Sequence, residues 1–185
     1  MLKLLPLLPL LLLLSACAGG GHCVRLPQTP AYCLRPPAET YGASQLVTAS
    51  GRGFRELSLL QLEADGQRLS LAALSPLGQP LLSAGWDGRR WSASSPFGGR
   101  VSEQGPAMLA LAQWLHLPEA AVLEGFGREP AWWLHTADGQ RRLMHGDRIL
   151  LIDAPTSKGR RVQLPSLGMT LEMEPLAITP DAEPQ

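Results

Sequence analysis

The sequence lacks an excess of charge of either sign, because its 185 residues carry 16 Lys and Arg against 16 Asp and Glu. Nucleic-acid binding uses a basic face that neutralises phosphates, so nothing here predicts a nucleic-acid partner. The sequence also lacks an apolar run long enough to cross a bilayer. The leucine-rich stretch 4–14 has 11 residues, whereas a membrane span needs about 20. We therefore interpret it as the hydrophobic part of a signal peptide.

Short catalytic motifs are also missing: the chain has no Gly-x-Ser-x-Gly, no His-Glu-x-x-His and no glycine-rich phosphate loop. His145-Gly146-Asp147 could pair an imidazole with a carboxylate, but Gly-Asp between two strands is more typical of a turn. His135 lies on a predicted strand and Asp153 at a predicted strand end, so we interpret both as structural. We predict no enzyme, no cofactor and no metal. The alternative, a hydrolase using His145 or His135, requires a serine or carboxylate within hydrogen-bond reach of the imidazole.

Three cysteines lie near the N-terminus. Cys17 follows Leu-Ser-Ala and precedes Ala18, an order that resembles the bacterial lipobox. The resemblance implies that residues 1–16 are a lipoprotein signal peptide and that Cys17 becomes a lipidated N-terminus. More than one acyl chain makes membrane anchoring durable. Because Ala18 is not Asp, the resemblance also implies anchoring in the outer membrane, facing the periplasm.

The other two cysteines, Cys23 and Cys33, form a pair in a compartment where disulfides persist. We predict a disulfide, which would restrict the unfolded chain by roughly 3 kcal/mol on the chain-entropy model. The alternative is a metal site that includes His22, but only three ligands lie close together and a fourth is missing.

The region 17–53 is rich in Gly, Pro, Ser and Thr. This composition predicts the lipidated N-terminus followed by an extended tether, with a short helix at 39–46 as an alternative for part of it. We predict the folded domain at 54–178 and a C-terminal tail at 179–185.

Three Asp-Gly pairs, at Asp65, Asp87 and Asp138, separate apolar runs within the predicted domain. Asp-Gly between such runs predicts a β-hairpin with a type I′ turn. The hairpin strands are expected at 57–64 and 68–74, at 81–86 and 90–93, and at 132–137 and 140–144. Three further strands are expected at 148–153, 161–167 and 169–174.

Between the second and third hairpins the apolar period changes to that of a helix. Pro106 suits a first helical turn, and Met108, Leu111 and Leu115 recur on one face. A second short helix follows Pro118. The order of strands, helices and strands predicts an α+β fold, with a curved antiparallel sheet that forms an unclosed half-barrel lidded by two short helices.

Apolar side chains in a curved sheet with a helical lid either fill the interior or line a cavity for an apolar ligand. On the residues alone, a filled core is the favoured interpretation. The candidate ligand contacts are Leu60, Leu62, Leu71, Leu82, Trp86, Trp114, Trp132 and Leu134.

Residues 69–78 read Leu-Ser-Leu-Ala-Ala-Leu-Ser-Pro-Leu-Gly. This run resembles the strand and protruding loop of LolB, the outer-membrane receptor that accepts lipoproteins from the carrier LolA. The chain has Ser75 where that loop has Asn. The resemblance implies a LolA/LolB-like half-barrel with an apolar cavity. It also implies a membrane-contact loop of Pro76, Leu77 and Gly78, in which an exposed Leu77 helps to insert acyl chains.

The runs 59–66 and 75–79 also resemble an uncharacterised proteobacterial lipoprotein family, whose genes often lie beside aryl-polyene or fatty-acid-like synthesis clusters. Together these features predict an outer-membrane lipoprotein that binds an acyl or polyene lipid, or lipoprotein acyl chains, and helps deliver it to the bilayer. A LolA-like periplasmic carrier is the expected protein partner. The alternative is a non-enzymatic envelope lipoprotein with a solid core, a structural or interaction module that binds a protein through a sheet edge or the Trp132-Trp133 surface.

Overall fold

The computed structural model describes residues 23–37 and 39–176. Its main feature is an antiparallel sheet built from two meanders. The strands of the first meander are β3 (Thr40–Gly51), β4 (Phe54–Asp65), β5 (Leu69–Leu74), β6 (Pro80–Trp86) and β7 (Trp91–Ser94). Those of the second are β8 (Ala131–His135), β9 (Arg141–His145), β10 (Arg148–Thr156), β11 (Gly159–Leu164) and β12 (Met169–Pro175). A 3-10 turn, η2 (Pro165–Leu167), connects β11 to β12.

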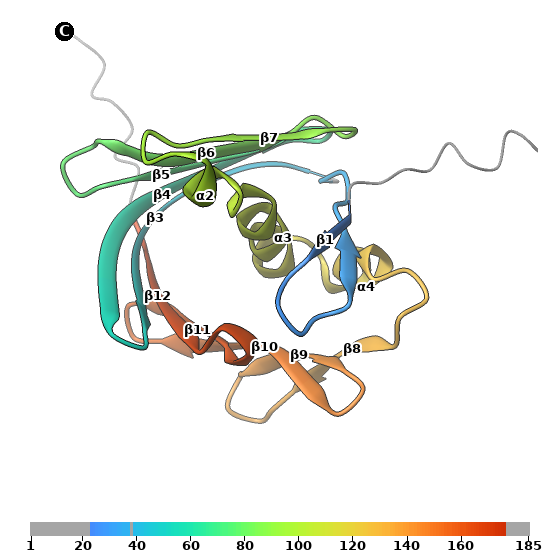
Figure 1. Cartoon of the computed structure of the whole chain (residues 1–185). Helices are drawn as coiled ribbons and strands as arrows, with labels where there is room; N and C mark the ends of the chain where they lie inside the picture. Colours follow the sequence, from blue (N-terminus) through green and yellow to red (C-terminus); the bar gives the residue numbers. More distant parts are fainter. Residues whose placement is uncertain (1–22, 38, 177–185) are drawn as a thin grey trace, which may run out of the picture.

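The two meanders are joined where β3 pairs with β12, and the strand order is β7-β6-β5-β4-β3-β12-β11-β10-β9-β8. The sheet curves strongly, and in the described part of the chain its two edge strands, β7 and β8, do not pair with each other. The predicted unclosed antiparallel sheet is therefore confirmed (Figure 1).

The chain crosses from one sheet edge to the other through α2 (Gly99–Ser102), α3 (Gly105–His116) and α4 (Glu119–Gly125). The last two are the predicted helices, and Pro106 occupies the first turn of α3 as expected. The single turn α2 was not predicted. Figure 1 shows α3 on the concave side of the sheet, between the two meanders. The fold class is therefore α+β, with helices over the concave face.

The N-terminal part of the described chain is a small two-stranded sheet, β1 (Cys23–Arg25) and β2 (Ala31–Cys33). A disulfide joins Cys23 to Cys33 across it. From β2, the buried Tyr32 ring reaches the helices, where it packs edge-on against Trp114 and Phe126 at centroid distances of 5.6 and 5.1 Å. This segment is therefore packed against the domain.

The prediction of an extended tether over 17–53 is wrong for the part that the structure describes. β3 is a 12-residue strand between β4 and β12, which also excludes the alternative helix at 39–46. The folded unit therefore begins well before the predicted boundary at residue 54. β3 contains the consecutive small residues Gly42, Ala43 and Ser44. Small side chains give a weak strand signal in the sequence, although the backbone of β3 pairs fully with β4. Cys17 and the predicted tail at 179–185 lie outside the described residues.

The three predicted hairpins are confirmed, but the type I′ turns are wrong. A type I′ turn needs positive φ at two consecutive residues, and at Gly66 and Gly88 only the glycine has it, with φ of 83° and 88°. The preceding aspartate closes each turn with its carboxylate instead. Asp65 Oδ1 accepts the Arg68 N–H (2.8 Å) and Asp87 Oδ1 accepts the Arg90 N–H (2.6 Å). These backbone bonds hold the pKa of both carboxyl groups below the usual range.

Candidate functional site

The concave side of the sheet, where the ligand cavity was predicted, is filled by α3. On that helix Trp114 is fully buried, and Leu109 beside it is too. Five of the eight predicted ligand contacts are no more than 4% exposed, and Leu60 is half-buried against the same core. The five are Leu62, Leu71, Leu82, Trp86 and Trp114. The structure thus brings Leu60, Leu62, Leu71, Trp86 and Trp114 to one interior around the helix, whereas Leu82 is buried but does not belong to that cluster.

The other two predicted contacts, Trp132 and Leu134, are 43% and 38% exposed on the edge strand β8. Side chains alternate between the faces of a strand, and it is Trp133 that packs against the core. The Arg141 guanidinium lies 4.9 Å from the centre of the Trp133 ring. The structure therefore does not bring Trp132 and Leu134 together with the residues of this interior.

The C-terminal end of α3 is held by two arginines from the second meander. Arg141 donates through Nη2 and Arg160 through Nη1 to the Leu115 carbonyl, at 3.2 and 3.3 Å. Both also bind Asp153, which is 5% exposed: Arg141 Nε donates to Oδ2 (2.7 Å) and Arg160 Nε to Oδ1 (2.9 Å). Cations at a helix C-terminus interact favourably with its dipole, so this cluster anchors that end of α3.

Asp153 was predicted to end a strand, but it lies inside β10. Burial by itself would raise the pKa of its carboxyl group, and the hydrogen bonds from Arg160 and Arg141 outweigh burial and leave that pKa below the usual range. The carboxylate is therefore charged at neutral pH and balances one of the two arginines.

His116, the last residue of α3, lies between the two meanders. Its ring stacks on Tyr41 of β3, with centroids 5.8 Å apart and planes 17° apart. Burial, with a smaller effect of the nearby Arg160 and Arg141 charges, lowers the pKa of His116 from 6.5 to about 4. The imidazole is therefore neutral at neutral pH.

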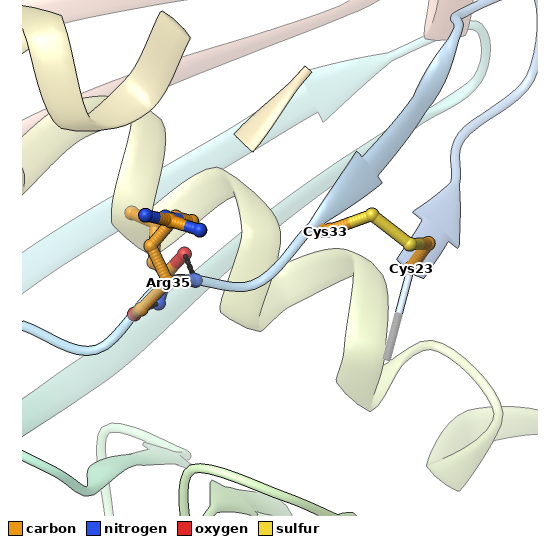
Figure 2. The surroundings of a disulfide bond; sticks show 4 residues. Cys23, Cys33 and Arg35 are labelled. Atoms are coloured by element: carbon orange, nitrogen blue, oxygen red, sulfur yellow. Dashed lines mark hydrogen bonds between the residues drawn. A yellow bond between two sulfur atoms is a disulfide. The ribbon is translucent and has the colours of Figure 1, made fainter. Parts of the chain in front are cut away.

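The N-terminal segment holds the C-terminal half of α3 through the fully buried Gln113. The Gln113 Oε1 atom accepts hydrogen bonds from the Tyr32 hydroxyl (3.0 Å) and the Arg35 N–H (2.9 Å), and its Nε2 donates to the Arg35 carbonyl (2.6 Å). Figure 2 shows Arg35 shortly after the disulfide at Cys33. The disulfide hairpin and α3 are thus linked by a satisfied buried polar group. The sequence analysis missed this contact, since no motif marks an amide that pairs with a distant backbone segment.

The predicted membrane-contact loop, Pro76 to Gly78, forms the turn between β5 and β6, where Leu77 is 86% exposed. The turn is internally bonded. Ser75 Oγ accepts the N–H groups of Leu77 (3.3 Å) and Gln79 (3.2 Å), and the Gly78 N–H donates to the Ser75 carbonyl (2.9 Å). The Leu77 side chain therefore projects into solvent from an ordered backbone.

Both candidate histidines have a carboxylate partner. His135 Nε2 lies 3.1 Å from Glu119 Oε2, and His145 Nε2 lies 3.1 Å from Glu129 Oε2. The partner of His145 is thus a glutamate before β8 and not the neighbouring Asp147. Among the described residues, no hydroxyl group is hydrogen-bonded to either imidazole. Both contacts are surface pairs that tie the second meander to the helical connection and its following loop.

An open groove of about 760 Å³ crosses β3 to β7 near the Asp65 and Asp87 turns. Leu69 and Trp86 line it but are buried, whereas Trp91 is 42% exposed. Small or charged residues make up most of the remaining lining. These are Gly42, Glu63, Ser70, Gly85 and Ser92, with Arg68 and Arg90 from the turns. The groove thus combines apolar and charged lining and borders the apolar interior at Leu69 and Trp86, and the sequence analysis missed it.

None of the helices within 23–37 and 39–176 combines the length and the apolar character needed to cross a membrane. In the same residues, no three His, Cys, Asp or Glu side chains are placed to share a metal ion. Residues 42–177 match a family model described as a protein of unknown function (DUF3261), and the chain belongs to this family. The matched region begins within β3 and ends after β12, so it coincides with the ten-stranded sheet. A search of curated proteins found no match.

Proposed function

We propose that the protein is an outer-membrane lipoprotein of LolA/LolB-like fold, anchored through Cys17. It binds an acyl or polyene lipid on the concave side of its half-barrel and helps deliver that lipid to the membrane, receiving it from a LolA-like periplasmic carrier. The observation that carries this proposal is Leu77, a leucine 86% exposed at the tip of an internally bonded turn. A leucine exposed to this extent contributes little to folding and is available for contact with a partner or a membrane.

The apolar interior supports the same proposal. Leu62 and Leu71 on the sheet belong to the same buried cluster as Leu109 and Trp114 on α3. An acyl chain can replace these contacts if α3 moves. Apolar packing is non-directional, so any apolar surface of similar size can cover the apolar face of the sheet. Delivery then needs no covalent chemistry. It needs only an affinity for the lipid that lies between the affinities of the donor and the acceptor.

The two ends of α3 are held differently, which favours displacement from its N-terminal end. The helix begins without a side-chain cap, whereas Arg141 and Arg160 bind its C-terminal carbonyl. The helix would pivot about the arginine cluster and expose the sheet beneath its first turns.

Native mass spectrometry with lipid extraction tests this function. A Cys17→Ala chain is purified without detergent and measured before and after incubation with lipid vesicles. We expect co-purifying acyl or polyene species, and denaturation should release them. A mass that corresponds to the lipid-free protein both before and after incubation would contradict the proposal.

The packed interior and the exposed Trp132 and Leu134 on the edge strand β8 favour a second candidate, a protein-interaction module of the envelope. An edge strand presents unpaired backbone groups to a partner strand. In that case the mass spectrum shows no bound lipid. Trp132→Ala then abolishes capture of the partner from envelope extracts while leaving the fold intact.

A further inference from the structure

The loop between β7 and α2 repeats the motif of the β5–β6 turn. Residues 95–98 read Ser-Pro-Phe-Gly and residues 75–78 read Ser-Pro-Leu-Gly, so both follow the pattern Ser-Pro-apolar-Gly. The sequence analysis used the copy at 75–78 and overlooked the copy at 95–98. A shared motif predicts a shared backbone, and the structure provides it.

The two loops share two hydrogen bonds. Ser95 Oγ accepts the Phe97 N–H at 3.1 Å, as Ser75 Oγ accepts the Leu77 N–H at 3.3 Å. In each loop the glycine N–H also donates to the serine carbonyl, at 3.3 Å in the first case and 2.9 Å in the second. The glycines have φ of 93° for Gly98 and 78° for Gly78, which side chains with a Cβ rarely adopt. Both loops therefore hold their apolar residue outward on an ordered turn.

The two loops lie at the same end of the sheet. The Ser95 hydroxyl donates to the Leu81 carbonyl (2.7 Å), and Leu81 is the second residue of β6, which begins directly after the β5–β6 turn. In Figure 1 both loops lie at the left of the first meander, away from the Asp87 turn. The tips Leu77 and Phe97 thus project from adjacent connections.

The two tip residues have the highest exposures among the large apolar side chains described, 86% for Leu77 and 66% for Phe97. Between residues 66 and 102 the only acidic residue is Asp87, which lies in the turn at the opposite end of these strands, while Arg100 follows Phe97. Two apolar tips beside a cation suit a bilayer with anionic headgroups. The turns satisfy much of their own backbone hydrogen bonding, as a group entering an apolar layer must.

We propose that Leu77 and Phe97 form a two-point membrane contact, in which both side chains insert together into the lipid interface. The inference rests on the proposed function for its location at a membrane, and it adds a second insertion residue. Two points restrict the tilt of the half-barrel on the bilayer more than a single leucine does.

Vesicle binding tests the contact. The chain without residues 1–17 keeps every described residue and is measured with vesicles of phosphatidylethanolamine and phosphatidylglycerol. We expect Phe97→Glu and Leu77→Glu each to weaken partitioning roughly tenfold, since burying one such side chain contributes about that factor or more. The double variant should be weaker than either. Leu176→Glu, an apolar position 42% exposed directly after β12, serves as the matched control and should bind like the unmodified chain.

A labelling experiment measures directly how deeply each tip inserts into the bilayer. With Cys23 and Cys33 in a disulfide, Leu77→Cys or Phe97→Cys places a single free thiol for an environment-sensitive fluorophore. We expect a blue shift and quenching by brominated lipid at both tips and neither effect at Leu176→Cys.

The outcomes separate this inference from the proposed function. If only position 77 responds, the two-point contact is overturned while lipid delivery through Leu77 stands. If the chain does not bind vesicles, or if both tips behave like the control, the membrane contact is overturned. The mass-spectrometry result then decides lipid binding independently. Retained melting temperatures of the glutamate variants show that any loss is not caused by unfolding.

Discussion

The two meanders of the sheet contact α3 in different ways. The first meander meets the helix through small apolar side chains: a Cβ built on Gly105 would collide with Ala93 and lie 3.2 Å from the Ala84 Cβ. The second meander meets it through the charged cluster of Asp153, Arg141 and Arg160. Small apolar contacts are non-directional, whereas hydrogen-bonded ion pairs fix geometry. The two ends of α3 therefore differ in kind: the N-terminal end is closely packed on small side chains, and the C-terminal end is pinned by hydrogen-bonded ion pairs.

The largest effect is expected at the pinned end. Asp153→Ala removes the carboxylate that Arg141 and Arg160 share, and breaking a buried ion pair from one side costs about 3–5 kcal/mol. Since the arginine side chains are 22% and 24% exposed, we expect the lower part of that range. Denaturant unfolding measures the loss.

Glu172→Ala is the matched control for Asp153→Ala, because Glu172 pairs with Arg161 where both side chains are about half exposed. Exposed pairs contribute about 0–1 kcal/mol. Equal losses in the two variants would show that the cluster does not pin α3.

The next effect is expected where the helix lies on the first meander. Gly105→Ala introduces a methyl group against Ala93, so α3 must shift and stability should fall by about 1–3 kcal/mol. Gly99→Ala is the control, since a Cβ at Gly99 in α2 meets nothing within 4 Å, and alanine is the better helix former by up to about 1 kcal/mol. Calorimetry compares the two melting temperatures, and a harmless Gly105→Ala would rule out the close contact. If α3 is the mobile element, Gly105→Ala should also increase lipid loading.

A smaller, pH-dependent effect is expected at His116, between the two meanders. Its pKa is about 4 in the folded protein and 6.5 in the unfolded chain, so the unfolded state takes up a proton first as pH falls. The free energy of unfolding is therefore highest above pH 6.5 and decreases as pH falls toward about 4. Because the ring is partly exposed, we expect a loss of about 1–2 kcal/mol over this window. Unfolding curves of His116→Gln should lack this part of the pH dependence, and an unchanged curve would exclude the histidine as its source.

Local signals explain why most of the fold could be predicted. Asp-Gly pairs and prolines act within a few residues, so the hairpins at Asp65, Asp87 and Asp138 and the helices after Gln104 and Pro118 were found. β3 was not found, because its Gly, Ser and Ala side chains carry little β propensity and its pairing with β12 joins residues more than 100 positions apart.

The site could be predicted only in part. Trp86 and Trp114 were expected inside the half-barrel and lie in the core, since large apolar side chains in amphipathic elements face inward. Which of Trp132 and Trp133 faces inward depends on the register of β8 against β9, and a one-residue slip reverses every face. Phe97 could have been found from the sequence, because its motif repeats that of Leu77.

The sequence by itself determined the local turns, the two helices and the exposed Ser-Pro-apolar-Gly tips, because hydrogen bonds within a few residues and proline geometry act in any context. The tertiary structure alone decided that α3 fills the concave face, that Asp153 is buried between two arginines, and that two tips 20 residues apart project from one end of the sheet. These features depend on strand pairing and burial across long separations. Their free energy arises only once the two meanders close around the helix.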